Sequence, residues 1–247
     1  MTISLRKSGS AILTAITILV GLSLTGRPAT AQNPELQQRL AEVKEASARN
    51  KEALATYTWR EQDTISLKGE VKKQESFQVH MGPDGKPQKA PLNAAAAAQP
   101  SQAHAGGRGG RLKEKVIENK KEEYKEYGQK MAALAHSYVP PDRAKLQQAF
   151  QEGNVKLGAG ATAGLVQLLI TNYVKPNDSM TITFDKASKA IQGVQIASYM
   201  DAPSDAVKIA VQFAKLADGT NHIATMTVEG VSKQLKVAVE NSSYKKM

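Results

Sequence analysis

Apolar and polar residues alternate along much of the chain after residue 164, and this pattern predicts a series of β-strands. Val207, Ile209, Val211 and Phe213 occupy every second position of the clearest run. Because successive strand residues point to opposite sides of a sheet, such a run has one apolar and one polar side. The same period recurs in four further runs: Met180, Ile182 and Phe184; Val194, Ile196 and Met200; Ala224, Met226 and Val228; and Leu235, Val237 and Val239.

Short polar segments separate these runs, so the pattern predicts an antiparallel meander. Turns are expected at 185–188, 201–205, 217–219 and near Gly230, where turn-forming residues gather. Antiparallel strands joined in this way form a sheet with one apolar side and one polar side. The segment 164–174 is also apolar, and its pattern leaves a strand and a buried helix both open.

A second meander is predicted between residues 57 and 92. Its first two strands carry apolar residues at one parity: Tyr57, Trp59, Ile65 and Leu67, then Phe77, Val79 and Met81. The segment Gly82-Pro-Asp-Gly85 is a turn, with proline at its second position. A short third strand is expected over 86–92.

Three stretches predict helices. Asn33-Pro34 opens the first, in which Leu36, Leu40 and Val43 recur at helical spacing. The second begins at Leu112 and ends before two consecutive prolines, which a helix seldom passes. A third, short helix is expected over 141–152. The predicted fold class is α+β, with a curved antiparallel β-meander, a half-barrel, packed on amphipathic helices.

The N-terminal segment 1–31 predicts a cleavable signal peptide. Arg6 and Lys7 precede an apolar run over 11–24, and Ala29-Thr-Ala31 offers the small residues that a signal peptidase recognises. We therefore expect a periplasmic or secreted protein with no transmembrane span in its mature form. Residues 32–247 are expected to form a single domain, with a flexible Ala/Gly-rich segment at 93–110 and a helical insertion at 112–152.

The composition of the chain excludes several kinds of chemical site and makes one class of partner unexpected. The chain of 247 residues has no cysteine, which excludes disulfides, thiolate metal sites and a cysteine nucleophile. Its formal net charge of +10 becomes +7 without Arg6, Lys7 and Arg27 of the leader. The basic residues are not interleaved with aromatic ones, so a nucleic-acid partner is not expected.

No catalytic or metal motif stands out, and we expect neither an enzyme nor a cofactor or metal site. The four histidines, His80, His104, His136 and His222, have no metal-ligand spacing. The segment Gly158–Ala163 has a loose dinucleotide pattern, but no strand is predicted before it, so a loop is expected. Glu61 and Asp63 share the parity of Trp59, and we expect them at a strand end that lifts into solvent.

Several short motifs resemble a group of exported bacterial proteins of unknown function: Tyr57-Thr-Trp, Leu67-Lys-Gly-Glu70, Gly82-Pro-Asp-Gly85, Tyr138-Val-Pro-Pro141 and Asp218-Gly-Thr-Asn221. That resemblance implies no activity. The order of elements is similar to the half-barrel of periplasmic Lol-type lipoprotein carriers and their lipoprotein-sorting-like relatives. This second resemblance implies an apolar concavity that shields acyl chains, with helices between 112 and 152 as a lid.

Three hypotheses follow. The first is non-enzymatic binding or carriage of a lipid, lipoprotein or other amphipathic envelope ligand in an apolar concavity. Its candidate lining residues are Tyr57, Trp59, Ile65, Leu67, Phe77, Val79, Met81, Ile182, Phe184, Val194, Ile196, Ile209, Val211 and Phe213. The second is a structural or interaction protein that contacts an envelope protein or an anionic glycan. The third is a hydrolase whose site combines Glu61, Asp63 or a histidine across strands.

Overall fold

The structure is a computed structural model that describes residues 34–92 and 110–247. The predicted leader at 1–31 and nearly all of the segment 93–110 lie outside these residues. The described elements are α1 (Pro34–Leu54), β1 (Tyr57–Leu67), β2 (Glu70–Met81), β3 (Pro87–Pro91), α2 (Gly110–Tyr138), α3 (Arg143–Gln151), β4 (Val155–Ala159), β5 (Leu165–Thr171), β6 (Ser179–Asp185), β7 (Ala190–Tyr199), β8 (Ala206–Lys215), β9 (Asn221–Gly230) and β10 (Leu235–Lys246).

All the strands form one antiparallel sheet, in the order β3-β2-β1-β10-β9-β8-β7-β6-β5-β4. Neighbours in this order are also neighbours in the chain, except that the first meander joins the second through the pairing of β1 with β10. The sheet is open, with β3 and β4 at its two edges. The prediction of an antiparallel meander in an α+β fold is therefore confirmed.

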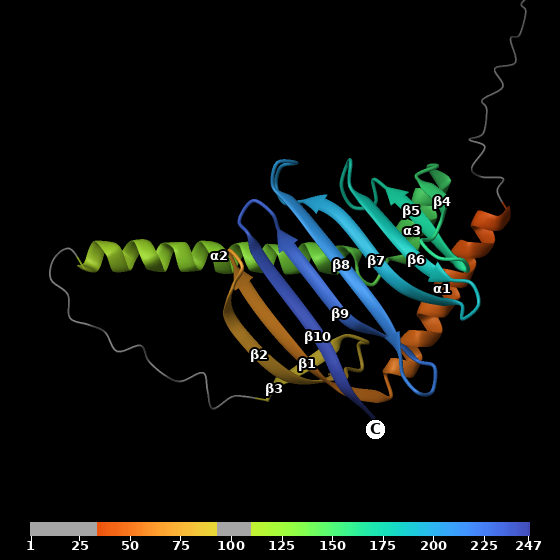
Figure 1. Cartoon of the computed structure of the whole chain (residues 1–247), viewed down its shortest axis with the longest axis horizontal. Coiled ribbons are helices and arrows are strands. Elements are labelled where there is room, and N and C mark those ends of the chain that lie inside the picture. Colours follow the sequence, from red (N-terminus) through yellow and green to blue (C-terminus); the bar gives the residue numbers. More distant parts are fainter. Residues whose placement is uncertain (1–33, 93–109) are drawn as a thin grey trace, which may run out of the picture.

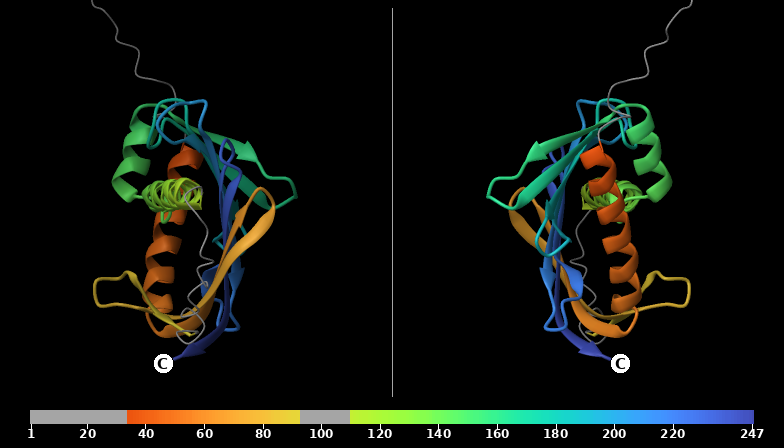
Figure 2. Two further views of the ribbon diagram at one scale, coloured as in Figure 1. Left: turned by 90° about the vertical axis from the view of Figure 1, so that its left-hand side faces the viewer. Right: turned by 90° about the vertical axis from the view of Figure 1, so that its right-hand side faces the viewer.

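The three helices lie on one side of the sheet, and the sheet curves around them (Figure 2). We call this helix-covered side the concave face and the opposite side the outer face. α2 crosses the sheet, and its N-terminal part extends beyond the sheet edge (Figure 1). None of the described helices is long and apolar enough to span a bilayer.

A close approach of α2 to β9 fixes where the helix crosses. A Cβ atom added at Gly230 would lie 2.5 Å from Cε1 of Tyr127 and 3.0 Å from Sδ of Met131. These distances are below ordinary van der Waals contact, so a larger residue at position 230 would push the helix away from the strand. The C-terminal part of α2 thus packs directly on the sheet.

Two local predictions differ from the structure. The expected loop over Gly158–Ala163 overlaps β4, which pairs with β5 from Val155 to Ala159. The sequence pattern did not predict this strand, because two glycines within six residues interrupt its short apolar run. The sequence left a strand and a buried helix both open for residues 164–174. In the structure this segment contains the strand β5, which lies between β4 and β6.

Candidate functional site

Apolar residues form continuous rows across the concave face. One row runs from Ile65 on β1 through Val237, Val228, Ile209, Ile196, Met180 and Ile170 to Val155 on β4, each residue paired with the next. A neighbouring row runs from Asp63 through Val239, Met226, Val211, Val194, Ile182 and Leu168 to Leu157. The alternation that predicted the strands therefore builds one apolar surface.

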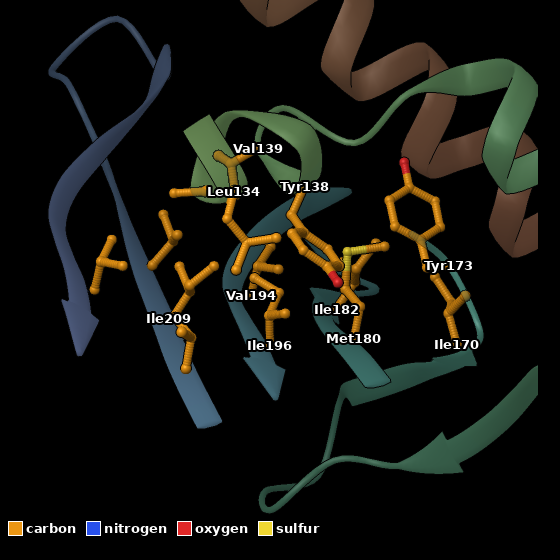
Figure 3. Packing of buried hydrophobic residues seen from close by; sticks show 14 of the residues in the cluster. Leu134, Tyr138, Val139, Ile170, Tyr173, Met180, Ile182, Val194, Ile196 and Ile209 are labelled. Carbon is orange, nitrogen blue, oxygen red and sulfur yellow. The ribbon is translucent and has the colours of Figure 1, made fainter. Parts of the chain in front are cut away.

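The helices bury one part of this surface completely. Inward-facing residues of β4–β8, together with Val228, pack against Met131, Leu134 and Tyr138 of α2 and Phe150 of α3. We call this region the packed half. Figure 3 shows Leu134, Tyr138 and Val139 lying over the strands. Ile182 and Val194 are 0% exposed, so the chain itself fills the space above them.

The same rows lose their cover toward β1 and β2. Ile65, Phe77, Met226, Val237 and Val239 are only half-buried. Four of them continue the rows of the packed half, and the fifth, Phe77 on β2, pairs with Glu61 beside these rows. We call these five residues the open half. Of them, Ile65 and Met226 touch the hydrophobic core, whereas Phe77, Val237 and Val239 lie outside it. Partly exposed apolar residues on a helix-covered face are the candidate binding surface.

A charged cluster borders the open half. Glu61 and Asp63 of β1 face the same side as Ile65, and Lys89 of β3 forms ion pairs with both carboxylates. Glu61 is 6% exposed, which corrects the expectation that this strand end lifts into solvent. Two carboxylates and one ammonium group make up this charged rim, and Oδ1 of Asp63 has no hydrogen bond within the described residues.

Burial controls the protonation of Glu61. Removal from water disfavours a carboxylate, and this raises the pKa of Glu61 although Lys89 opposes the change. Lys89 is less enclosed, with its side chain 41% exposed. Its ammonium group also lies 5.5 Å from the centre of the Phe77 ring, which links the charged rim to the open half.

Aromatic residues close the concave face at the far end of β1. The rings of Trp59 and Tyr244 stack with centroids 5.5 Å apart, and His222 lies 4.2 Å from Tyr244. Nε1 of Trp59 donates to Oδ1 of Asn241 at 3.0 Å. These side chains are packed against one another, so Tyr57 and Trp59 belong to a small second core.

The motif Tyr138-Val-Pro-Pro141 has a structural role. The hydroxyl of Tyr138 donates to the buried carboxylate of Asp178 at 2.5 Å and lies 2.8 Å from Oγ of Ser198. Asp178 also accepts hydrogen bonds from the backbone N–H groups of Tyr173, Val174 and Lys175. Burial and this carboxylate raise the pKa of Tyr138, so it stays a neutral donor that fixes the end of α2.

The motif Asp218-Gly-Thr-Asn221 joins three elements. Tyr57 donates to Asp218 at 2.6 Å, and this bond helps to lower the pKa of Asp218 to about 2. Asn221 exchanges hydrogen bonds with Asn50 of α1 and donates to the carbonyl of Ile191 on β7. The Leu67-Lys-Gly-Glu70 motif is a two-residue hairpin turn, with Lys68 at φ 53° and Gly69 at φ 83°.

Among the described residues, no hydrogen bond or ion pair joins a histidine to the carboxylates of the charged rim. His80 is exposed on β2, and His136 is exposed near the end of α2. His104 lies outside the described residues. Within the described ranges, no three His, Asp or Glu side chains come together as metal ligands would.

The candidate lining residues fall into separate groups. Ile182, Phe184, Val194, Ile196, Ile209 and Val211 lie in the packed half. Tyr57, Trp59 and Val79 are buried near the charged rim. Ile65, Leu67, Phe77, Met81 and Phe213 are half-buried. Sequence reasoning did not include Met226, Val237 and Val239, although their alternation placed them on the same face.

Comparison with known proteins assigns no residue a role. No protein-family model and no curated protein sequence matches the chain. Among solved structures, a DUF1329 family protein from Desulfovibrio piger is similar, with a TM-score of 0.44 and 13% sequence identity, over 85% of this chain and 92% of that chain. The resemblance to Lol-type carriers stays a prediction.

Proposed function

We propose that this protein is a non-enzymatic binding or carrier protein of the cell envelope. Its ligand is a lipid, a lipoprotein or another amphipathic molecule whose apolar part lies on the open half. The supporting observation is the change in burial within one row, where Ile65 and Val237 are half-buried and Val228 is 3% exposed. Covering such surface with an acyl chain is favourable by about 0.8 kcal/mol for each buried methylene.

The charged rim suits the polar end of such a ligand. Asp63 and Ile65 are two residues apart on β1 and face the same side, so polar and apolar groups adjoin. A molecule with a tail on the open half would place its head near Asp63 and Lys89. The predicted leader at 1–31 supports an envelope location, where an acyl chain needs protection from water.

A non-enzymatic role fits the arrangement of the carboxylates. Glu61 is held by Lys89, and neither Glu61 nor Asp63 bonds to a histidine within the described residues. A general acid or base must reach the proton that it transfers. The charged rim is instead arranged as an ion-paired polar border.

Fluorescent fatty-acid titration of the delipidated protein tests this function. Val239→Asp introduces a charge into the open half, and we expect it to weaken binding at least about ten-fold, because a buried unpaired charge is costly. Ala238→Asp is the matched control, since Ala238 is next in the chain and faces the outer side. Absence of saturable binding of a fatty acid or lipopeptide to the wild-type protein would refute the proposal, as would equal weakening by both variants.

The alternative of a structural or interaction protein is favoured by another observation. The N-terminal part of α2 extends beyond the sheet, and within the described residues the outer face carries no helix (Figures 1 and 2). An envelope protein or anionic glycan would bind at such uncovered parts. Affinity capture of a stoichiometric partner, with no extractable lipid, would support this alternative over carriage.

A further inference from the structure

A hollow on the outer face lies where two neighbouring strands separate. β9 and β10 pair only as far as Thr225 and Glu240, and β10 then continues along β1 alone. The separation leaves a hollow of about 380 Å³, which Arg60 and Gln62 of β1 also line. This volume is suited to a small ligand.

Two β-bulges form the walls of the hollow. In β9, Ala224 is an extra residue between the partners of Gln212 and Phe213. In β10, Ser243 and Tyr244 lie opposite a single residue of β1, and Ser243 has φ 55°. Bulges commonly occur next to binding sites, where they redirect side chains and end the pairing of strands. Both Ala224 and Ser243 line the hollow.

The inner wall of the hollow is fixed by hydrogen bonds. Asn241 accepts from Nε1 of Trp59 and donates to the carbonyl of Ile223, each at 3.0 Å. Arg60 faces the opposite side of β1 from Glu61, because neighbouring strand residues alternate. The hollow therefore belongs to the outer face and is separate from the open half.

Four polar side chains around the hollow have no partner within the described residues. Within the described residues, the side chains of Arg60, Gln62, Thr225 and Glu240 make no hydrogen bond or ion pair, whereas Asn241 beside them makes two. A guanidinium group recognises a carboxylate through two parallel hydrogen bonds. A carboxylate such as that of Glu240 accepts hydrogen bonds from an ammonium group.

Arg60 and Glu240 lie near each other in the sheet, so one small molecule can reach both side chains. Arg60 pairs with Ser242 and Gln62 pairs with Glu240, so Arg60 and Glu240 are diagonal neighbours in the ladder. Such neighbours are about 7–8 Å apart. From these observations we propose that the hollow binds small zwitterions, either a free amino acid or a short peptide. Its carboxylate bonds to Arg60, and its ammonium group bonds to Glu240.

Amide chemical-shift titration of the ¹⁵N-labelled chain tests this proposal. The probes are glycine, glycylglycine, acetate and methylammonium. Glycine or glycylglycine is expected to give saturable shifts at Thr225, Glu240 and Ser242, and the tighter of the two distinguishes an amino acid from a peptide as the source. Acetate and methylammonium each supply one charge only, so they are expected to bind at least about ten-fold more weakly.

Charge-removing variants locate the site. Arg60→Gln and Glu240→Gln are each expected to weaken zwitterion binding at least about ten-fold. Lys208→Gln and Glu229→Gln are matched controls, because this opposite-charge pair lies in register on the same face across β8 and β9. The proposal is overturned if neither zwitterion gives saturable shifts, if acetate binds as tightly as glycine, or if both site variants bind normally. Fatty-acid binding by Arg60→Gln stays unchanged, which separates this site from the proposed function.

Discussion

The packed and open halves of the concave face share their rows of residues but differ in what covers them. Ile196 and Ile65 belong to the same row, and Ile196 is 3% exposed whereas Ile65 is half-buried. α2 and α3 supply the cover of the packed half through Met131, Tyr138 and Phe150. The apolar face is larger than the area that α2 and α3 bury, and the remainder is where we propose that an external ligand binds.

The largest expected effect is a difference in stability between the two halves. Ile196→Ala removes methyl groups from a filled core and is expected to lower the free energy of unfolding by about 2–5 kcal/mol. Ile65→Ala removes the same atoms from a half-buried position, and we expect about half that loss because less surface and no closed cavity are involved. Urea unfolding of both variants measures the two values. Equal losses would remove the distinction between the halves.

Hydrogen bonding to Asp178 is expected to contribute less to the packed half than apolar burial does. Tyr138→Phe deletes the hydroxyl that donates to Asp178, and we expect a loss of about 1–3 kcal/mol because buried partners are left unsatisfied. Tyr124→Phe in the same helix is the control. A Tyr138→Phe variant as stable as this control would show that the end of α2 is fixed by apolar contacts alone.

Removal of one partner from the charged rim is expected to lower the free energy of unfolding. Lys89→Met leaves Glu61 and Asp63 without their cation, and we expect a loss of about 1–2 kcal/mol at neutral pH. This is less than the 3–5 kcal/mol that is usual for a fully buried pair, because the Lys89 side chain is 41% exposed. The double variant Lys89→Met/Glu61→Gln should recover part of that loss.

The raised pKa of Glu61 gives this effect a pH dependence. The folded chain binds the Glu61 proton more tightly than the unfolded chain does. Protonated Glu61 therefore contributes most to stability below the ordinary pKa of 4.5, and this contribution is lost as pH rises through the pKa of the folded state. The loss caused by Lys89→Met should therefore shrink toward acid pH. A loss that is independent of pH would contradict the burial of an ionised Glu61.

The smallest effect is expected where Tyr57 meets Asp218. The pKa of Asp218 falls from 3.8 to about 2, chiefly through the hydrogen bond from Tyr57. The stabilisation is therefore complete above pH 3.8 and is lost as pH falls through about 2. Asp218→Asn should be less stable than the wild-type protein near neutral pH, and urea midpoints should converge in acid. Asp201→Asn, at an exposed turn, is the control. An equal change of the urea midpoint in this control would mean that the effect comes from the loss of any negative charge.

Alternation predicted the sheet well because each strand carries its own pattern. The runs at Val207–Phe213 and Leu235–Val239 needed no knowledge of their neighbours, and both lie in the strands expected. Pairing between β1 and β10 was not predictable in this way, because the two strands lie at opposite ends of the described chain. The rows that define the concave face depend on that pairing.

The division into two halves was beyond sequence reasoning for a physical reason. Ile182 and Ile65 have the same local pattern, and the packing of the helices buries Ile182 whereas Ile65 stays half-buried. The expected solvent exposure of Glu61 was wrong because Lys89, its partner, comes from a different strand. Local patterns give the direction in which a side chain points, and long-range contacts decide what it meets.

The most direct test is methyl NMR of the protein with a fatty acid that carries a spin label on its chain. The label broadens methyl signals within its reach, so it reports where the chain lies. We expect broadening at Ile65, Val237 and Val239 and sharp signals at Ile182, Val194 and Ile196. Absence of broadening at the open half, or equal broadening of both groups, would contradict this expectation.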